Sequence, residues 1–280
     1  MADSENIERQ QEALERTPTD HPDRVGRLLN LGRKHHDRYL DIGAMVDLET
    51  AIHLYQEALD ASSTDSDRAA SLKDLGCGYH DRYHDAGPMT DLETAVQLWK
   101  EGLGITFTDS PERACLLDCL ASGYLEKAQE GAEAFVLESA ISLFHMALDG
   151  TPTNHSDRAS RLMGLGAAYH TKYAAKRTRV DLEAAIQKFH EAVDITAKNS
   201  PDRAYRVQDL ANGYLYKFEV DEVNADCETA IQLLQEAVDS LSSRVHDRLN
   251  AGMVLMSCHA EAKNWPEAWQ TATKIVTLIP

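Results

Sequence analysis

One short motif recurs along the chain at almost constant spacing, and this feature limits the possible folds more than any other. Each copy places Asp or Glu directly before Arg, and successive copies begin 44 or 45 residues apart. The six arginines are Arg24, Arg68, Arg113, Arg158, Arg203 and Arg248. A period of this length is typical of repeat proteins, in which each unit is one small supersecondary structure that shares its core with its neighbours.

The residues after each arginine predict two helices per repeat. Leucine stands seven residues after every one of these arginines, and Gly or Ala usually follows it. Steps of 4, 7, 8 and 11 residues trace one face of a helix, which we name helix A. A second block with helical spacing follows, for example DLETAIHLYQEAL over 47–59, and predicts helix B. The small residue of helix A permits close packing, and the whole chain is expected to be all-α.

Two dipeptides mark expected helix starts. Ser110-Pro111 and Ser200-Pro201 each place a capping residue before a proline at the first helical position. Only 8 prolines occur in 280 residues, and the many Ala, Leu, Glu and Gln residues also favour helix over strand.

The L-G-x-x-Y pattern of helix A, as in Leu75, Gly76 and Tyr79, and an Ala-aromatic-Ala pattern on helix B resemble the tetratricopeptide repeat (TPR). The resemblance covers residues 5 to 280. The units are longer than usual, with seven extra residues between the tyrosine and the first helix-B alanine, and in this they resemble kinesin-light-chain-like and CHAT-associated arrays. The last unit lacks that insertion, so Ala268 and Pro280 fall at ordinary TPR positions.

The resemblance implies an α-solenoid, a right-handed superhelix of tandem helix-turn-helix repeats of about 45 residues with a concave face. We expect a single repeat domain over 1–280. It would comprise a half-repeat or cap helix over 5–18 and repeats starting near 21, 65, 110, 155, 200 and 245.

Charge and composition restrict the partners. The formal net charge of −18 disfavours nucleic acid and anionic membrane surfaces. The chain lacks an apolar run of the ~20 residues that span a bilayer, and its N-terminus resembles neither a secretory signal nor a transit peptide. Five cysteines without a CxxC pair fit a reducing compartment. We therefore predict a cytoplasmic protein that binds neither nucleic acid nor membrane.

Two more charges recur in the five long repeats. A base stands 14 residues after the repeated arginine and an acid 25 residues after it. We predict that these groups form an electrostatic ladder, in which the bases Arg38, Arg82, Lys127, Lys172 and Lys217 pair with Glu49, Glu93, Glu138, Glu183 and Glu228. The repeated arginine itself also needs a compensating partner, because a cation in the first turn of a helix opposes the helix dipole.

The TPR resemblance implies that partners contact helix A on the concave side. Those positions vary between repeats, and the predicted partner-binding residues are Arg33, His36, Lys73, His80, Asp118, His170, Gln208, Asn212 and Tyr216. The Lys/Asn clamp with which some relatives hold a chaperone C-terminus is broken here, because Leu29 and Cys77 occupy two of its positions.

Cofactor, metal and catalytic sites are not expected. His80 and His84 have the i, i+4 spacing of a zinc pair, but no third ligand stands at a recognisable spacing, so we interpret them as surface histidines. Cys115 and Cys119 fit small buried hydrophobes. Gly76-Cys77-Gly78 belongs to the repeat and is not a nucleotide loop, and no motif of a known catalytic class is present.

The leading functional hypothesis is therefore a scaffold or adaptor that binds a peptide or helix, of basic character, in its concave groove. A second hypothesis is the sensor or regulatory arm of a larger assembly such as a caspase-like CHAT protease. A third is a cryptic enzyme or small-ligand binder. The final run IVTLIP lacks a polar capping helix, which leaves three interpretations open: an array that was cut short, self-association through this C-terminal end, or docking of another chain there.

Overall fold

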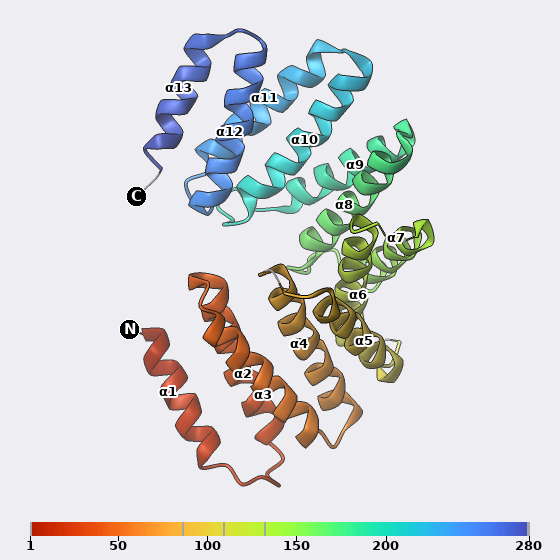
Figure 1. The fold of residues 1–280 in the computed structure, drawn as a ribbon, viewed down its shortest axis with the longest axis vertical. Helices are drawn as coiled ribbons and strands as arrows, with labels where there is room; N and C mark the ends of the chain where they lie inside the picture. The colour runs from red at the N-terminus through yellow and green to blue at the C-terminus, as the bar shows by residue number, and fades with distance from the viewer. Residues whose placement is uncertain (1, 86, 109, 132, 279–280) are drawn as a thin grey trace. The chain divides into compact units, whose positions relative to one another are not determined.

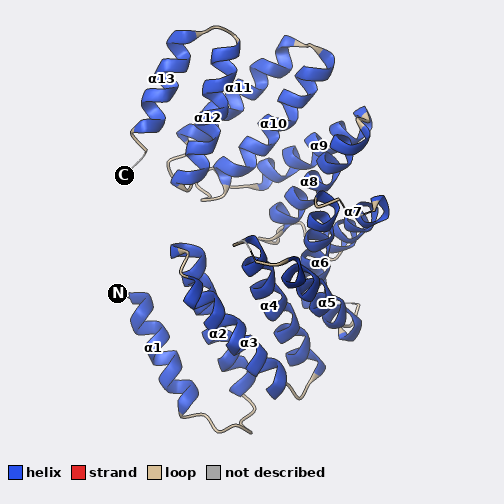
Figure 2. Ribbon diagram, in the orientation of Figure 1, coloured by secondary structure: helices blue, strands red, loops and turns tan. Residues whose placement is uncertain are grey.

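The computed structural model describes residues 2–85, 87–108, 110–131 and 133–278, and every regular element within them is an α-helix (Figures 1 and 2). Thirteen helices occur in this described part of the chain. The predicted α-solenoid of helix-turn-helix repeats is confirmed. The helices are α1 (Ala2–Glu15), α2 (Arg24–Ile42), α3 (Met45–Ala61), α4 (Asp65–His84), α5 (Met89–Ile105), α6 (Pro111–Gln129), α7 (Ala134–Asp149), α8 (Arg158–Lys176), α9 (Arg179–Ile195), α10 (Arg203–Asp221), α11 (Asn224–Asp239), α12 (Val245–Glu261) and α13 (Trp265–Val276).

The chain divides into two compact units, Met1–Gly150 and Thr151–Pro280. The first contains α1 to α7 and the second α8 to α13. Even-numbered helices are the predicted A helices, and odd-numbered helices from α3 onward are the B helices. Each A helix packs most extensively on the B helix of its own repeat. Helix α2 also contacts α4, α4 contacts α6, and in the second unit α10 contacts α12.

Helix lengths follow the repeat pattern, with two corrections at helix boundaries. Helix α13 has 12 residues, shorter than the 17 of α9, as the missing insertion predicts. The cap helix, expected over 5–18, spans Ala2–Glu15, because Pro18 disfavours helical geometry at the residue before it. Helix α6 starts at Pro111 as predicted, but α10 starts at Arg203. The predicted closing residue Pro280 lies outside the described residues.

Close packing within each repeat depends on the small residue of helix A. A Cβ atom placed on Gly32 would lie 2.6 Å from the Tyr55 ring, and one on Gly76 would lie 2.3 Å from Nε1 of Trp99. Tyr55 and Trp99 are each 1% exposed. The glycines therefore admit the large side chains of helix B, as the sequence predicts, and the same arrangement recurs in the second unit between Gly166 and Phe189.

A second glycine, two residues further along helix A, faces the preceding repeat. A Cβ on Gly78 would lie 2.7 Å from Ile52 of α3, and one on Gly213 would lie 2.8 Å from Ile186 of α9. Residues two apart on a helix lie about 200° apart around its axis. One helix A thus packs tightly against helix B of its own repeat and helix B of the repeat before it.

The repeated arginine is compensated from two directions. Arg203 donates to the carbonyl oxygens of Val193 and Thr196 at the end of α9, at 3.1 and 2.7 Å. It also contacts Glu236 of α11 at 2.7 Å. Carbonyls at a helix C-terminus carry partial negative charge, so the arginine joins one repeat to the next. Arg24 makes the equivalent contacts with Thr17 and Glu57.

The predicted electrostatic ladder exists, but its main acid is an aspartate. Arg82 binds Asp91 through two hydrogen bonds of 2.8 and 2.9 Å, and Lys217 lies 3.0 Å from Asp226. These aspartates stand two residues before the predicted glutamates, in the first turn of helix B, where an acid is favoured by the helix dipole and faces helix A. The predicted glutamate partner is found for Arg82, whose Nη1 also lies 3.3 Å from Glu49.

We expect Gly76→Ala to lower the free energy of unfolding by about 1–3 kcal/mol, because the added methyl group overpacks the contact with Trp99. The matched control is Gly104→Ala, where nothing lies within 4 Å of the new Cβ. That change should leave stability equal or raise it by up to about 1 kcal/mol. Urea unfolding of both variants measures the difference, and equal midpoints would contradict the packing argument.

Asp91→Asn should lower the free energy of unfolding by about 1–3 kcal/mol, because it leaves the half-buried guanidinium of Arg82 without its main charged partner. Glu93→Gln, two residues away and exposed, should change stability by less than about 0.5 kcal/mol. Thermal unfolding distinguishes the two carboxylates. A larger effect at Glu93 would restore the original assignment of the ladder.

Candidate partner-binding face

The predicted partner-binding residues all lie on A helices. In the first unit Arg33 and His36 are on α2, Lys73 and His80 on α4, and Asp118 on α6. In the second unit His170 is on α8, and α10 carries Gln208, Asn212 and Tyr216. We call the surface formed by these residues in each unit its A-helix face.

On the A-helix face of the first unit, side chains of successive repeats contact one another. Nε of Arg33 donates to Oδ2 of Asp74 at 2.7 Å. Nε2 of His36 lies 2.5 Å from Oδ2 of Asp81. Nε2 of His80 lies 2.7 Å from Oε1 of Glu126. Three predicted binding residues are therefore already engaged between neighbouring repeats.

These contacts shift the pKa values of the groups involved. Burial lowers the pKa of His80, but its interactions with Asp81 and Glu126 outweigh burial and raise it to about 10. Burial raises the pKa of Asp81, yet His36 and His80 together lower it to about 2. The pKa of His36 is raised because Asp81 offsets the effect of burial. The A-helix face of the first unit thus carries a row of alternating basic and acidic side chains that stabilise each other's charges.

Two contacts between neighbouring repeats join the same pair of repeat positions. Arg33 stands nine residues after its repeat arginine and meets Asp74, six residues after the next one. Cys77 and Cys119 occupy the same two positions one repeat later, and their sulfur atoms lie 3.9 Å apart. Cys119, predicted from the sequence to be a small buried hydrophobe, is half-buried, and its thiol lies against the preceding repeat. The hydrogen bond with Cys119 lowers the pKa of Cys77.

Lys73 and Asp118 complete the predicted set in the first unit. Nζ of Lys73 lies 3.1 Å from Oδ1 of Asp74. Burial lowers the pKa of Lys73, but Asp74 more than offsets this and the pKa is raised. Both side chains are half-buried, so they border the polar row and are not fully exposed.

The A-helix face of the second unit is different in kind. The rings of His170 and Tyr216 pack with centroids 4.7 Å apart, and burial together with Arg177 lowers the pKa of His170. Gln208 and Asn212 stand one helical turn apart and are half-buried. Within the described residues, their amide groups make no hydrogen bond.

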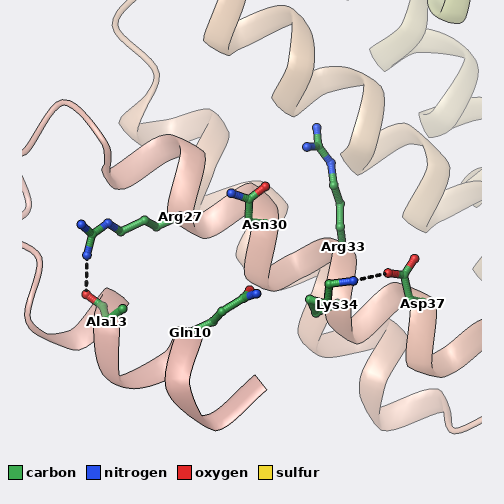
Figure 3. Close-up of a pocket in the computed structure, with 7 residues that line it drawn as sticks. All are labelled: Gln10, Ala13, Arg27, Asn30, Arg33, Lys34 and Asp37. Atoms are coloured by element: carbon green, nitrogen blue, oxygen red, sulfur yellow. Dashed lines mark hydrogen bonds and ion pairs between the residues drawn. The ribbon is translucent and has the colours of Figure 1, made fainter. Parts of the chain in front are cut away.

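A hollow of about 520 Å3 lies between α1 and α2 (Figure 3). Its lining includes Gln10, Arg27, Asn30, Lys34 and Asp37, and its charged groups are largely satisfied. Arg27 donates to the carbonyl oxygen of Ala13 at 2.9 Å, and Lys34 contacts Asp37 at 3.1 Å. Of the predicted binding residues only Arg33 reaches this hollow, and in Figure 3 its side chain extends away from α1.

Comparison with solved structures assigns the architecture. The chain resembles the nearly identical TPR-like repeats of a kinesin light chain candidate from Podosopora anserina, with a TM-score of 0.56, 18% identity and coverage of 78% of this chain and 97% of that chain. It also resembles pilF of Pseudomonas aeruginosa, with a TM-score of 0.58, 15% identity and coverage of 91% and 92%. The C-terminal part of a TPR repeat-containing protein from Cytophaga hutchinsonii matches with a TM-score of 0.51, 10% identity and coverage of 100% and 91%.

The chain therefore has a TPR-like fold. No family model and no curated protein matches its sequence. Among the described residues, none of the helices combines the length and the apolar character needed to cross a membrane.

Asp209 of α10 is the acidic group with an unusual setting in the second unit. It stands at the repeat position that Asp74 occupies in the first unit, but the position of Arg33 in the preceding repeat is taken by Ala167. Burial, together with nearby Asp247 of α12, raises the pKa of Asp209 to about 6. An acid whose pKa is raised by folding destabilises the folded state when it ionises.

We expect Asp209→Asn to raise the free energy of unfolding at pH 7 by about 2 kcal/mol, because the wild-type group must ionise in a half-buried place. The carboxyl of Asp209 ionises near pH 4 in the unfolded chain and near pH 6 in the folded chain. The stability that protonated Asp209 contributes is therefore fully present below about pH 4 and is lost as the pH rises through about 6. Urea unfolding at several pH values checks this, with Glu219→Gln on the same helix as the control. An equal pH dependence in wild type and Asp209→Asn would contradict it.

Proposed function

We propose that the protein is an interaction scaffold that binds an extended peptide or a helix of a partner protein on its A-helix face. The observation that carries the proposal is the pair Gln208 and Asn212. Both amides are half-buried on α10 and unused within the described residues. A primary amide both donates and accepts hydrogen bonds, so two amides one turn apart match the alternating groups of a peptide backbone.

Charge favours a basic partner. The net charge of −18 raises the association rate with basic segments, because complementary charge steers the encounter. The aromatic side chains of Tyr205 and Tyr216 flank the amides on the same helix and offer apolar contact area with few rotatable bonds. The proposed ligand therefore combines Lys or Arg with an apolar side chain.

We further propose that both units belong to one repeat array over 1–280. The repeat register supports this, since the 45-residue step from Arg113 to Arg158 spans the division after Gly150. A cytoplasmic location and a role as the regulatory arm of a larger assembly stay predictions. Self-association through the last repeat also stays a prediction, and the surface it would use carries Trp265 and Trp269 of α13, which are 64% and 77% exposed.

The test is selection of peptides from a random displayed library on the full chain, followed by affinity measurement on variants. We expect enrichment of Lys and Arg in the selected peptides. The double variant Gln208→Ala with Asn212→Ala should weaken binding at least about tenfold, because it removes two half-buried hydrogen-bonding groups. The control Gln232→Ala, on the exposed side of α11, should change affinity less than about twofold.

Unfolding midpoints of the three proteins separate lost binding from lost structure. Equal affinity of wild type and the double variant would exclude the A-helix face of the second unit as the binding surface. Failure to enrich any peptide would contradict peptide binding as the function.

A further inference from the structure

Two histidines and a glutamate converge at one end of the first unit's A-helix face. His80 and His84 stand one turn apart on α4, and Glu126 projects from α6 of the next repeat. Oε1 of Glu126 lies 2.7 Å from Nε2 of His80 and 3.0 Å from Nε2 of His84. One ligand atom from each of the three residues lies within 4.8 Å of the others.

These distances are close to those of a metal centre. Zinc bonds of about 2.0–2.2 Å in tetrahedral geometry place neighbouring ligand atoms about 3.3–3.5 Å apart. Small rotations of the three side chains would bring their ligand atoms to that spacing. The sequence offered only the pair of histidines, because Glu126 is 42 residues beyond His84 and joins it only when the repeats stack.

The surroundings orient the ligands. The ring of His80 packs edge-on against Trp99, with centroids 5.4 Å apart, and its Nδ1 lies 3.6 Å from Oδ1 of Asp81. A carboxylate hydrogen-bonded to the second ring nitrogen is the usual support for a metal-bound histidine, and Asp81 lies just beyond hydrogen-bond distance of that nitrogen. Oε2 of Glu126 is buried and has no hydrogen-bond partner among the described residues, so the carboxylate keeps unused acceptor capacity.

We propose that His80, His84 and Glu126 form a binding site for one Zn2+ or a chemically similar divalent transition metal. Two imidazoles and one carboxylate suit this class better than Mg2+ or Ca2+, which prefer oxygen ligands. A metal binds an imidazole nitrogen only when that nitrogen carries no proton, so metal binding releases any proton held there. Because the side chain of His84 is 53% exposed, the fourth ligand is water or a group from a partner. The ion joins α4 to α6 and so fastens two repeats together.

The first experiment titrates tag-free full chain with Zn2+ in competition with a chromophoric chelator. We expect one equivalent to bind. His84→Ala should weaken it at least about tenfold and leave the metal-free unfolding midpoint nearly unchanged, because this side chain lies half in solvent. The matched control is His190→Ala, which removes an exposed histidine with its own i, i+4 acid, Asp194, and should leave Zn2+ affinity as in wild type.

A second readout is independent of affinity. Co2+ in a tetrahedral site gives intense visible absorption, whereas the hexahydrated ion is pale. We expect this band in wild type and in His190→Ala, and its loss in His84→Ala and in Glu126→Gln. Equal Zn2+ affinity of wild type and His84→Ala, or a Co2+ spectrum like that of the free ion, would overturn the proposal. Peptide binding by the second unit is a separate measurement, so either proposal can fail alone.

Discussion

In three of the repeats the two helices approach closely at a residue of helix A that has no side chain. At Gly32, Gly76 and Gly166 a methyl group would enter the ring of the facing aromatic residue. The large side chain is buried there, so the contact supplies both apolar burial and a fixed separation of helices A and B. Glycine weakens a helix by about 1 kcal/mol relative to alanine, and the burial of a whole aromatic ring offsets this cost.

The same tight spacing extends between repeats and determines which polar groups meet. The second glycine of helix A lets it approach the preceding helix B, as at Gly78 and Ile52. Helices α2, α4 and α6 then lie near enough for side chains of successive repeats to touch. Two contacts recur, one between the positions of Arg33 and Asp74 and one between those of His36 and Asp81. Apolar packing thus comes first, and the polar contacts follow from its geometry.

The sequence was sufficient for the fold because its information is periodic. Helix class, the pairing of A with B and the shorter last repeat could all be predicted from spacing alone. The wrong predictions concern details that depend on where a helix begins. Arg82 pairs with Asp91 and not with Glu93, because the start of helix B determines which of the two side chains points toward helix A. Helix α10 begins two residues after Pro201 because Ser200 and Pro201 precede a turn.

The candidate site was predictable in position but not in its contacts. Helix-A residues could be assigned to one face from periodicity, whereas Glu126 and His84 come together only through the crossing of α4 and α6. That crossing depends on packing and cannot be obtained from spacing within one repeat. Such pairs can be found by comparing one position of each repeat with the position that contacts it in the next repeat. His36, 12 residues after its repeat arginine, and Asp81, 13 residues after the next one, are an example.

The two units therefore share the same helix packing but differ in the side chains on their A-helix faces. In the first unit several positions that face a neighbouring repeat carry acids and bases that pair with each other, while Oε2 of Glu126 has no hydrogen-bond partner among the described residues. In the second unit Ala167 replaces a base, Asp209 is left with a raised pKa, and Gln208 and Asn212 keep unused amides. Gln208 and Asn212 are half-buried, so water still reaches their amides, and a ligand with complementary donors and acceptors can replace that water.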